Sequence, residues 1–342
     1  MTPEAWDYVA GGAEDEITIG DNAAAFLRRR FVPRVLVDAG AADTGTTLLG
    51  RRVTLPIGVA PVAAHALAHP DGEVATARAA ASAGALFCLS TVSSQSIEEV
   101  AAAVPEAARW FQLYVNEDRR FTRRLVERAE AAGYGAIVVT VDLPVLGYRE
   151  REKRRGWTLD VPLGNFAEYA GSGAEGAQRG GAVDLDRLLD MRHAGLTWNG
   201  LATLRDWTSL PLVIKGILHP DDAGLAVERG AAAVWVSNHG GRQLDRSIAS
   251  LDALAAVAAA VGGRAEVYVD GGVRRGSDAL IARALGARAV FAGRPFLFAL
   301  GAAGQAGVGH AFGILREELE RAMTLLGTPS LDDVHAGHLA TG

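Results

Sequence analysis

The chain has 342 residues, of which 49% are apolar, so it can bury a sizeable core. Its formal net charge is −6 and it has no long basic block, which argues against nucleic acid or an anionic membrane as a partner. No signal-peptide pattern opens the sequence, and no apolar stretch looks long or charge-free enough to span a bilayer. Cys88, the single cysteine, excludes an internal disulfide and suits a reducing compartment. We therefore expect a cytoplasmic protein that acts on a small molecule.

Eight short runs rich in β-branched and aromatic residues recur along the chain, and an alanine-rich segment of helical period follows each of them. Most runs are continuously apolar, as is typical of strands buried on both faces of a parallel sheet. We expect strands at residues 53–60, 85–90, 109–115, 136–142, 212–215, 232–237, 266–270 and 288–292. Eight strand–helix units indicate an α/β fold of the (β/α)8 TIM-barrel type, and a doubly wound sheet is the alternative.

The spacing of these units predicts one domain over residues 1–342, with three additions to the barrel. Residues 1–50 precede the first unit and are expected to cover the bottom or side of the barrel. Residues 143–210 form a long insertion after the fourth strand, and long insertions in compact domains are usually functional or disordered. Because this insertion would emerge at the C-terminal face, we predict a mobile lid over the site. Residues 304–326 are expected to form one further amphipathic helix.

Polar side chains follow the predicted strands at their carboxyl ends, where barrels carry their chemistry. They are Ser90, Gln112, Tyr114, Thr140, Asp142, Lys215, Ser237, His239 and Asp270. Several sit within apolar stretches, where an unpaired polar group costs a few kcal/mol, so they either satisfy one another or face a polar ligand. Lys215 is one of two lysines in a chain with 34 basic residues, which suggests a place where arginine does not fit.

The last two units indicate a phosphate site. "DGGVRRG" and "AGRP" place Gly272, Arg274, Gly293 and Arg294 where barrels commonly bind phosphate through backbone N–H groups. A phosphate there, a lysine on strand five and hydrogen-bonding side chains on strands two to four together fit flavin mononucleotide (FMN).

The stretch "SNHGGRQLD", residues 237–245, adds a titratable imidazole and a cation beyond that plane. On a purely structural interpretation, this stretch is a polar turn that caps the strand. On the functional interpretation, His239 is a general base, and Arg242 and Arg149 bind a carboxylate. For Arg149 the alternative is a solvated arginine of the insertion.

"SNHGGRQLD" closely resembles the signature of the FMN-dependent α-hydroxy acid oxidase and dehydrogenase family, which includes glycolate oxidase, lactate oxidase and mandelate-oxidising enzymes. The resemblance continues through "WDYVAGGAEDE", "APVAAHALAHPDGE", "WFQLYV", "TVDLPVLGYRE", "LPLVIKG", "DGGVRRGSD" and "GRP". It implies oxidation of an L-2-hydroxy acid to the 2-oxo acid with FMN as cofactor. It also implies a homotetramer or a larger assembly.

The resemblance assigns roles position by position. His239 is the implied catalytic base, and Asp142 stabilises its protonated form. Arg149 and Arg242 bind the substrate carboxylate, assisted by Tyr8 and Tyr114. The implied flavin contacts are the backbone of Val62 and Ala63, the side chains of Ser90, Gln112, Thr140, Lys215, Ser237 and Asp270, and, at the phosphate, Gly272, Arg274, Gly293 and Arg294. No metal-ligand spacing is visible.

Two departures refine the expected reaction. Glycolate oxidases tend to carry tryptophan where this chain has Val92, which favours a 2-hydroxy acid larger than glycolate. Ala63 resembles the oxidase branch, which points to oxygen as acceptor and hydrogen peroxide as product. The alternatives are a soluble dehydrogenase or monooxygenase of this family, another FMN barrel such as the flavin-dependent isopentenyl diphosphate isomerase, a barrel acting on a phosphorylated metabolite without flavin, and a non-catalytic flavin-binding redox sensor. A base together with two carboxylate-binding arginines argues against the last three.

Overall fold

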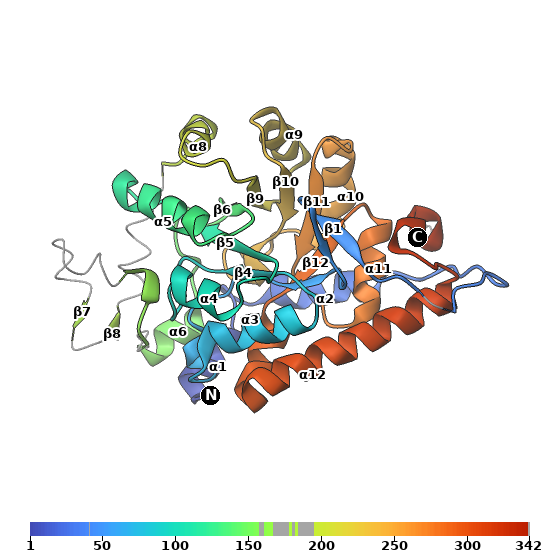
Figure 1. The fold of residues 1–342 in the computed structure, drawn as a ribbon, viewed down its shortest axis with the longest axis horizontal. Coiled ribbons are helices and arrows are strands. Elements are labelled where there is room, and N and C mark those ends of the chain that lie inside the picture. The colour runs from blue at the N-terminus through green and yellow to red at the C-terminus, as the bar shows by residue number, and fades with distance from the viewer. Residues whose placement is uncertain (41, 157–160, 167–177, 180–181, 184–194, 341–342) are drawn as a thin grey trace.

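A computed structural model describes residues 1–40, 42–156, 161–166, 178–179, 182–183 and 195–340. Eight strands close into a barrel in which each pairs in parallel with its neighbours, in the order β3, β4, β5, β6, β9, β10, β11, β12 and back to β3 (Figure 1). Their bounds are β3 Ile57–Val59, β4 Phe87–Leu89, β5 Arg109–Leu113, β6 Ile137–Thr140, β9 Leu212–Ile217, β10 Ala233–Val236, β11 Glu266–Asp270 and β12 Ala289–Ala292. The predicted TIM barrel is confirmed. The doubly wound alternative is wrong, because such a sheet has two open edges.

Helices follow the strands and surround the barrel (Figure 1). They are α3 Gly72–Ser82, α4 Ile97–Ala103, α5 Arg119–Ala131, α8 Trp198–Arg205, α9 Pro220–Glu228, α10 Ser250–Val261, α11 Gly276–Ala284 and α12 Arg294–Leu326. The helix expected at 304–326 is the second part of α12, whose backbone leaves helical geometry at Ala303 and Gly304. Two helical segments meet at this break, and the first of them, residues 294–302, starts directly after strand β12 and precedes the expected helix.

Helix α12 also corrects an expectation about membranes, since its length and composition alone would allow it to cross one. In this structure it packs against α3 and α11, and it buries apolar side chains from Phe296 to Leu326. That packing is what the outer ring of a barrel requires of its last helix.

The first predicted strand, 53–60, is two elements rather than one. Strands β1 Thr46–Leu48 and β2 Arg51–Val53 form an antiparallel hairpin, and the barrel strand β3 begins only after Pro56. Leu48 and Val53 pack with the inward-facing side chains of the barrel base. The apolar run 53–60 thus begins at the last residue of this hairpin, which closes the bottom of the barrel, and continues into strand β3.

The N-terminal helices α1 Pro3–Ala10 and α2 Ile17–Leu27 differ from the expectation for residues 1–50. The bottom is covered by the hairpin, but α1 lies at the mouth, where Tyr8 and Val9 line the main cavity. Buried arginines explain this placement: Arg242 donates to the carbonyl oxygens of Tyr8 and Gly11, and Arg294 donates to that of Val9. The strand ends supply the cations, and the N-terminal segment supplies their acceptors.

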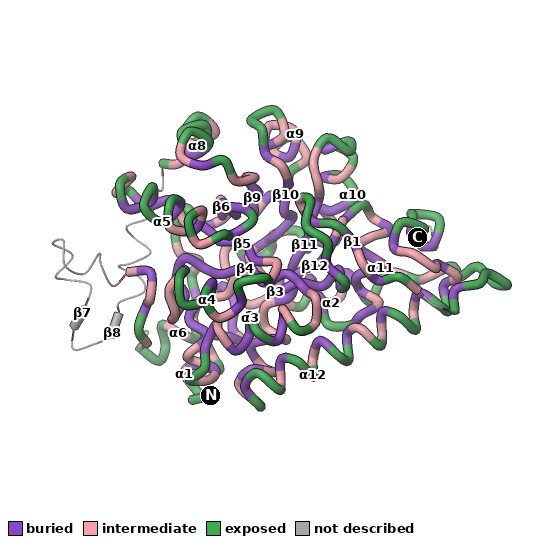
Figure 2. Tube along the Cα trace, in the orientation of Figure 1, coloured by how far each residue is buried: buried purple, intermediate pink, exposed green. Residues whose placement is uncertain are grey.

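Aromatic rings fill the lower part of the barrel. Trp110, Trp235, Tyr268 and Phe291 are all at most 2% exposed and contact one another. Gly58 leaves room for this cluster, since a Cβ there would lie 2.5 Å from the Phe291 ring. The eight barrel strands are accordingly buried, apart from the half-buried Gly216 and Glu266 (Figure 2). A ligand can therefore enter only above these rings, at the mouth.

The predicted lid, residues 143–210, is described in part. It contains helix α6 Glu150–Arg155, the short pair β7 Gln178–Arg179 and β8 Ala182–Val183, and helix α8. Residues 157–160, 167–177, 180–181 and 184–194 lie outside the described residues. Asn165 ties the insertion to the loop after β4, because its amide donates to Thr91 and Ser93 and its oxygen accepts from Ile97. The lid itself stays a prediction.

Candidate active site

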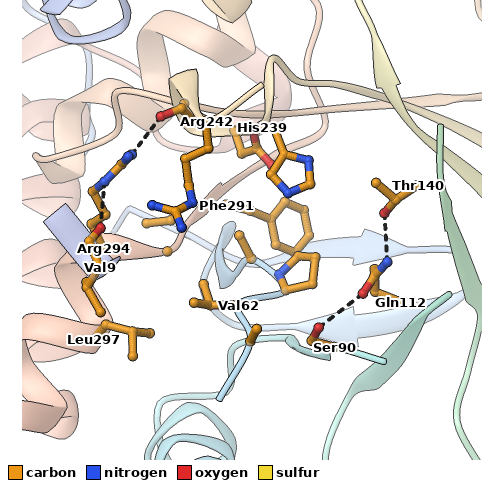
Figure 3. Close-up of a pocket in the computed structure, with 18 of the residues that line it drawn as sticks. Val9, Val62, Ser90, Gln112, Thr140, His239, Arg242, Phe291, Arg294 and Leu297 are labelled. Atoms are coloured by element: carbon orange, nitrogen blue, oxygen red, sulfur yellow. Dashed lines mark hydrogen bonds between the residues drawn. The ribbon is translucent and has the colours of Figure 1, made fainter. Parts of the chain in front are cut away.

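A cavity opens at the carboxyl ends of the barrel strands, and almost every residue singled out from the sequence lines it (Figure 3). These lining residues are Tyr8, Val62, Ala63, Ser90, Val92, Gln112, Tyr114, Thr140, Arg149, Lys215, His239, Arg242, Asp270, Gly272, Arg274, Gly293 and Arg294. Asp142 and Ser237 are not among its walls, and each lies behind a lining side chain to which it is hydrogen-bonded. The structure therefore shows that the residues predicted from separate parts of the sequence come together around one cavity.

His239 is presented to the cavity by an unusual turn. The turn follows β10, and His239 itself has a φ of +58°, which is uncommon for a residue with a side chain. Its backbone N–H donates to Ser237, which fixes the turn. The imidazole Nδ1 lies 2.8 Å from Asp142 Oδ1, and Nε2 lies 3.4 Å from the Tyr114 hydroxyl. With Nδ1–H donating to the carboxylate, Nε2 carries the lone pair, and it lies at the cavity within reach of the Tyr114 hydroxyl.

The charges of this pair suit a general base. Burial lowers the pKa of His239, although the Asp142 carboxylate acts in the opposite direction, so the imidazole is neutral near pH 7. Burial alone would raise the pKa of Asp142, but the charges of His239 and Lys215 hold it below its ordinary value. Asp142 is thus ionised and ready to stabilise a proton taken up by the imidazole.

Gly216 makes room for this carboxylate. Its φ is +109°, and a Cβ there would lie 2.6 Å from the Asp142 side chain. The residue after the strand-five lysine must therefore be glycine for the acid–base pair to form.

Lys215 belongs to a second buried network beside His239. Its Nζ donates to the Ser237 hydroxyl at 2.8 Å and lies 3.1 Å from Asp270, while Ser237 donates to the same carboxylate. Burial would lower the pKa of Lys215, but the Asp270 carboxylate raises it above the ordinary value. A fixed positive charge therefore lies at the cavity wall.

Strands β4, β5 and β6 contribute an uncharged polar wall. Ser90 donates to the side-chain oxygen Oε1 of Gln112, and the Gln112 side-chain amide donates to the Thr140 hydroxyl at 3.0 Å (Figure 3). The three side chains hold one another in place, which leaves the second amide N–H of Gln112 and the hydroxyl hydrogen of Thr140 for a ligand. Such a wall matches a planar heterocycle with hydrogen-bonding groups along its edge.

Four arginines converge on the same cavity. Burial and the neighbouring Arg242 lower the pKa of Arg149 to about 10, and the same effects, with Arg274 added, lower the pKa of Arg294 to about 9. Burial also lowers the pKa of Arg274. Buried cations that repel one another are stabilised by anions, so we expect the cavity to bind negatively charged ligands.

Arg294 differs in part from the role predicted for it. It lines the cavity but donates to the carbonyl oxygens of Val9, Gly240 and Gly11, so three of its five N–H groups brace the mouth. Within the described part of the chain, the Arg274 guanidinium donates to the carbonyl of Val273 alone, and so it keeps more donors for an anion. Gly272 has a φ of +92°, and Asn22 crowds the place where a Cβ would lie.

Sequence reasoning missed several apolar walls of the cavity, namely Val9, Leu143, Phe291 and Leu297. Leu143 directly follows Asp142 at the end of strand four, and Leu297 lies one turn after Gly293, so both positions could have been inferred from their neighbours. Phe291 lies within the predicted strand 288–292, whereas Val9 required knowledge of where α1 packs. In the described part of the chain, no group of three or more His, Cys, Asp or Glu side chains is placed to hold a metal ion.

Comparison with known proteins decides the family. The model of a family described as FMN-dependent dehydrogenase matches residues 1–341. The chain belongs to this family. It is 48% identical to an L-lactate oxidase of Nostoc sp. over 99% of this chain and 94% of that one, and 46% identical to glycolate oxidase 1 of Oryza sativa subsp. indica over 98% and 91%. A solved structure of mandelate oxidase with (S)-4-hydroxymandelic acid is 43% identical and superposes with a TM-score of 0.92, over 100% of this chain and 95% of that one.

Family membership makes this chain an FMN-dependent oxidoreductase that acts on CH–OH groups of 2-hydroxy acids. The cavity fits the cofactor on its own chemistry. The polar wall of Gln112 and Thr140 suits the edge of the flavin ring, Lys215 suits negative charge on that ring, and Arg274 suits the phosphate. His239 and Arg149 remain for the substrate.

Proposed function

We propose that this enzyme oxidises an L-2-hydroxy acid larger than glycolate to the 2-oxo acid, with oxygen as acceptor and hydrogen peroxide as product. One observation carries the proposal: an imidazole paired with a largely buried carboxylate lines the same cavity as two largely buried guanidinium groups. A general base beside a carboxylate-binding pair selects an acid with a removable proton near its carboxylate. A redox sensor without turnover has no use for this set.

The roles follow from the positions of the side chains. Arg149 and Arg242 bind the substrate carboxylate, assisted by Tyr8 and Tyr114. His239 Nε2 accepts a proton from the substrate, and Asp142 stabilises the resulting imidazolium. FMN, when bound, supplies the acceptor for the two electrons that leave the substrate. The cofactor would be held by Val62, Ala63, Ser90, Gln112, Thr140, Lys215, Ser237, Asp270, Gly272, Arg274, Gly293 and Arg294.

Oxygen as the acceptor is tested by following dissolved oxygen during turnover and then adding catalase. We expect catalase to return half of the oxygen consumed, since two molecules of peroxide yield one of oxygen. Ala63, at the cavity wall, supports this proposal only by its resemblance to the oxidase branch. No return of oxygen would indicate a monooxygenase. Turnover with a quinone but not with oxygen would indicate a dehydrogenase.

Val92 supports the proposed substrate size. It is 2% exposed, lines the cavity, and its carbonyl accepts from the backbone N–H of Ala64, so the position is rigidly built. We expect Val92→Trp to fill the space for the substrate side chain, lowering kcat/KM for mandelate roughly 100-fold while that for glycolate changes less than threefold. Val92→Ile is the conservative control. Equal losses for both acids would contradict a size-selecting role.

We propose a homotetramer as the assembly. An exposed apolar patch supports association: Val35 and Leu36 lie beside the end of α12, where Leu325 is 77% exposed and the Arg34 N–H donates to Leu326. Light scattering coupled to gel filtration tests the proposal. We expect four copies for the native chain and a smaller species for Leu36→Asp, whereas a monomeric native chain would contradict it.

A further inference from the structure

The two arginines proposed to bind the substrate carboxylate share one carboxylate of the protein itself, Glu152. Its Oε1 lies 3.1 Å from Arg242 Nη2, and its Oε2 lies 3.8 Å from Arg149 Nη1. All three side chains are largely buried, at 6%, 14% and 13% exposed for Arg149, Arg242 and Glu152. Both arginines line the cavity, whereas Glu152 is not among its lining residues. The carboxylate therefore contacts the arginines from outside the cavity.

The position of Glu152 is fixed by the short helix that carries it. Helix α6 begins directly after Arg149, so Glu152 lies three residues on and faces the same side. Ion pairs anchor α6 to the N-terminal segment: Arg155 pairs with Asp7, and Arg151 pairs with Glu16. Because α6 is held at both sides of Glu152, the carboxylate is a fixed charge rather than a mobile one.

The remaining contacts leave the arginines dependent on this charge. Arg149 otherwise donates to the carbonyl of Arg242 and to Gln243, at 3.3 and 3.4 Å, and both of these acceptors are neutral. Arg242 otherwise donates to backbone carbonyls of Tyr8 and Gly11. Two like charges confined to one desolvated wall repel each other, and among the described groups Glu152 is the carboxylate that ion-pairs with both.

We infer that Glu152 is a positioning residue that holds Arg149 and Arg242 together as one carboxylate-binding site. With it, the wall carries a net charge of one, which a single substrate carboxylate neutralises. Without it, the wall carries two unbalanced cations that move apart, and the bidentate geometry is lost. This inference rests on the proposed function, in which these arginines bind the carboxylate.

The inference also has a consequence for pH. Burial and Arg242 lower the pKa of Arg149 to about 10, whereas Glu152 raises it. The other charged or titratable groups near Arg149 are Tyr8, Tyr114, His239 and Arg294. Removing the Glu152 charge lowers the pKa of Arg149 further, so the binding of a carboxylate is lost at a lower pH as the pH rises.

The experiment compares Glu152→Gln, Glu152→Asp and Glu150→Gln holoenzymes with the native one, using oxalate as a non-oxidisable carboxylate and calorimetry as the readout. Glu150 is the matched control, since it lies on the same helix and its side chain is 40% exposed. We expect Glu152→Gln to weaken oxalate binding about tenfold at pH 7.5, with the loss growing towards pH 9.5. Glu152→Asp restores part of the affinity, and Glu150→Gln behaves as the native enzyme. Substrate KM rises in parallel, with kcat changed less than threefold.

The outcomes separate this inference from the function on which it rests. Native-like oxalate affinity and pH dependence in Glu152→Gln would overturn the positioning role and leave the proposed function intact. A native holoenzyme that binds no carboxylate would overturn both. If Glu152→Gln loses FMN or folds poorly, the Glu152→Asp variant decides between the outcomes. It keeps the negative charge on a shorter side chain, so we expect it to bind oxalate more weakly than the native enzyme does, with an affinity that still depends on this charge. Native affinity in that variant would contradict the inference.

Discussion

Replacing His239 with alanine should stop the reduction of FMN by the substrate while the cofactor remains bound. The imidazole lines the cavity and combines a basic nitrogen, Nε2, with a carboxylate partner, Asp142, 2.8 Å from Nδ1. A positioned general base contributes roughly 10²–10⁴-fold to a rate, so we expect a loss of at least that size. Stopped-flow absorbance under anaerobic conditions measures it, and the exposed His310→Ala serves as control. Reduction at the native rate would remove His239 from the mechanism.

The same residue sets the acid limb of the pH profile. Because burial lowers the pKa of His239 below its ordinary value of 6.5, the base stays unprotonated down to that lower pH. We therefore expect kcat/KM to be level near pH 7 and to fall as the pH drops below 6.5. A limb with its midpoint above pH 7 would show that the imidazole is protonated more easily than its surroundings imply.

Arg149→Gln should cause the second large loss. The variant leaves the substrate carboxylate with one arginine in a buried site, and truncating one partner of a buried charge pair costs ~2–5 kcal/mol. We expect kcat/KM to fall about 10²–10³-fold for 2-hydroxy acids, and much less for the corresponding methyl esters, which lack the carboxylate charge. Arg154→Gln is the matched control, because that arginine is on the same helix and 77% exposed. Equal losses for acid and ester would assign Arg149 a structural role.

The barrel could be predicted from the sequence because its strands are buried on both faces. The runs 136–142 and 232–237 are continuously apolar up to residues 139 and 236, and each contains an observed strand, β6 and β10. The polar residues at their ends were predictable for the same reason, since parallel strands bring their carboxyl ends to one face. Convergence of Gln112, Thr140 and Lys215 at one cavity thus follows from pattern and topology together.

The sequence predictions were wrong where tertiary packing determines the bounds or the position of an element. Val53 and the residues of β3 lie in one largely apolar run, but Val53 ends the hairpin and β3 begins after Pro56, so the proline marks a break that the apolar pattern concealed. Helix α1 reaches the mouth because Arg242 and Arg294 need its carbonyl groups, which a linear reading does not reveal. Glu152 was missed for a similar reason, since it lies in the charged stretch 149–155 and only the structure shows that its side chain is 13% exposed.

The most direct test of this account is an anaerobic visible spectrum of the holoenzyme, titrated with glycolate, lactate, mandelate and longer-chain 2-hydroxy acids before air is readmitted. The account predicts that the flavin bands bleach with an acid larger than glycolate and return with oxygen. Flavin bands that no 2-hydroxy acid changes would contradict the assignment of the substrate, the base and the carboxylate-binding arginines together.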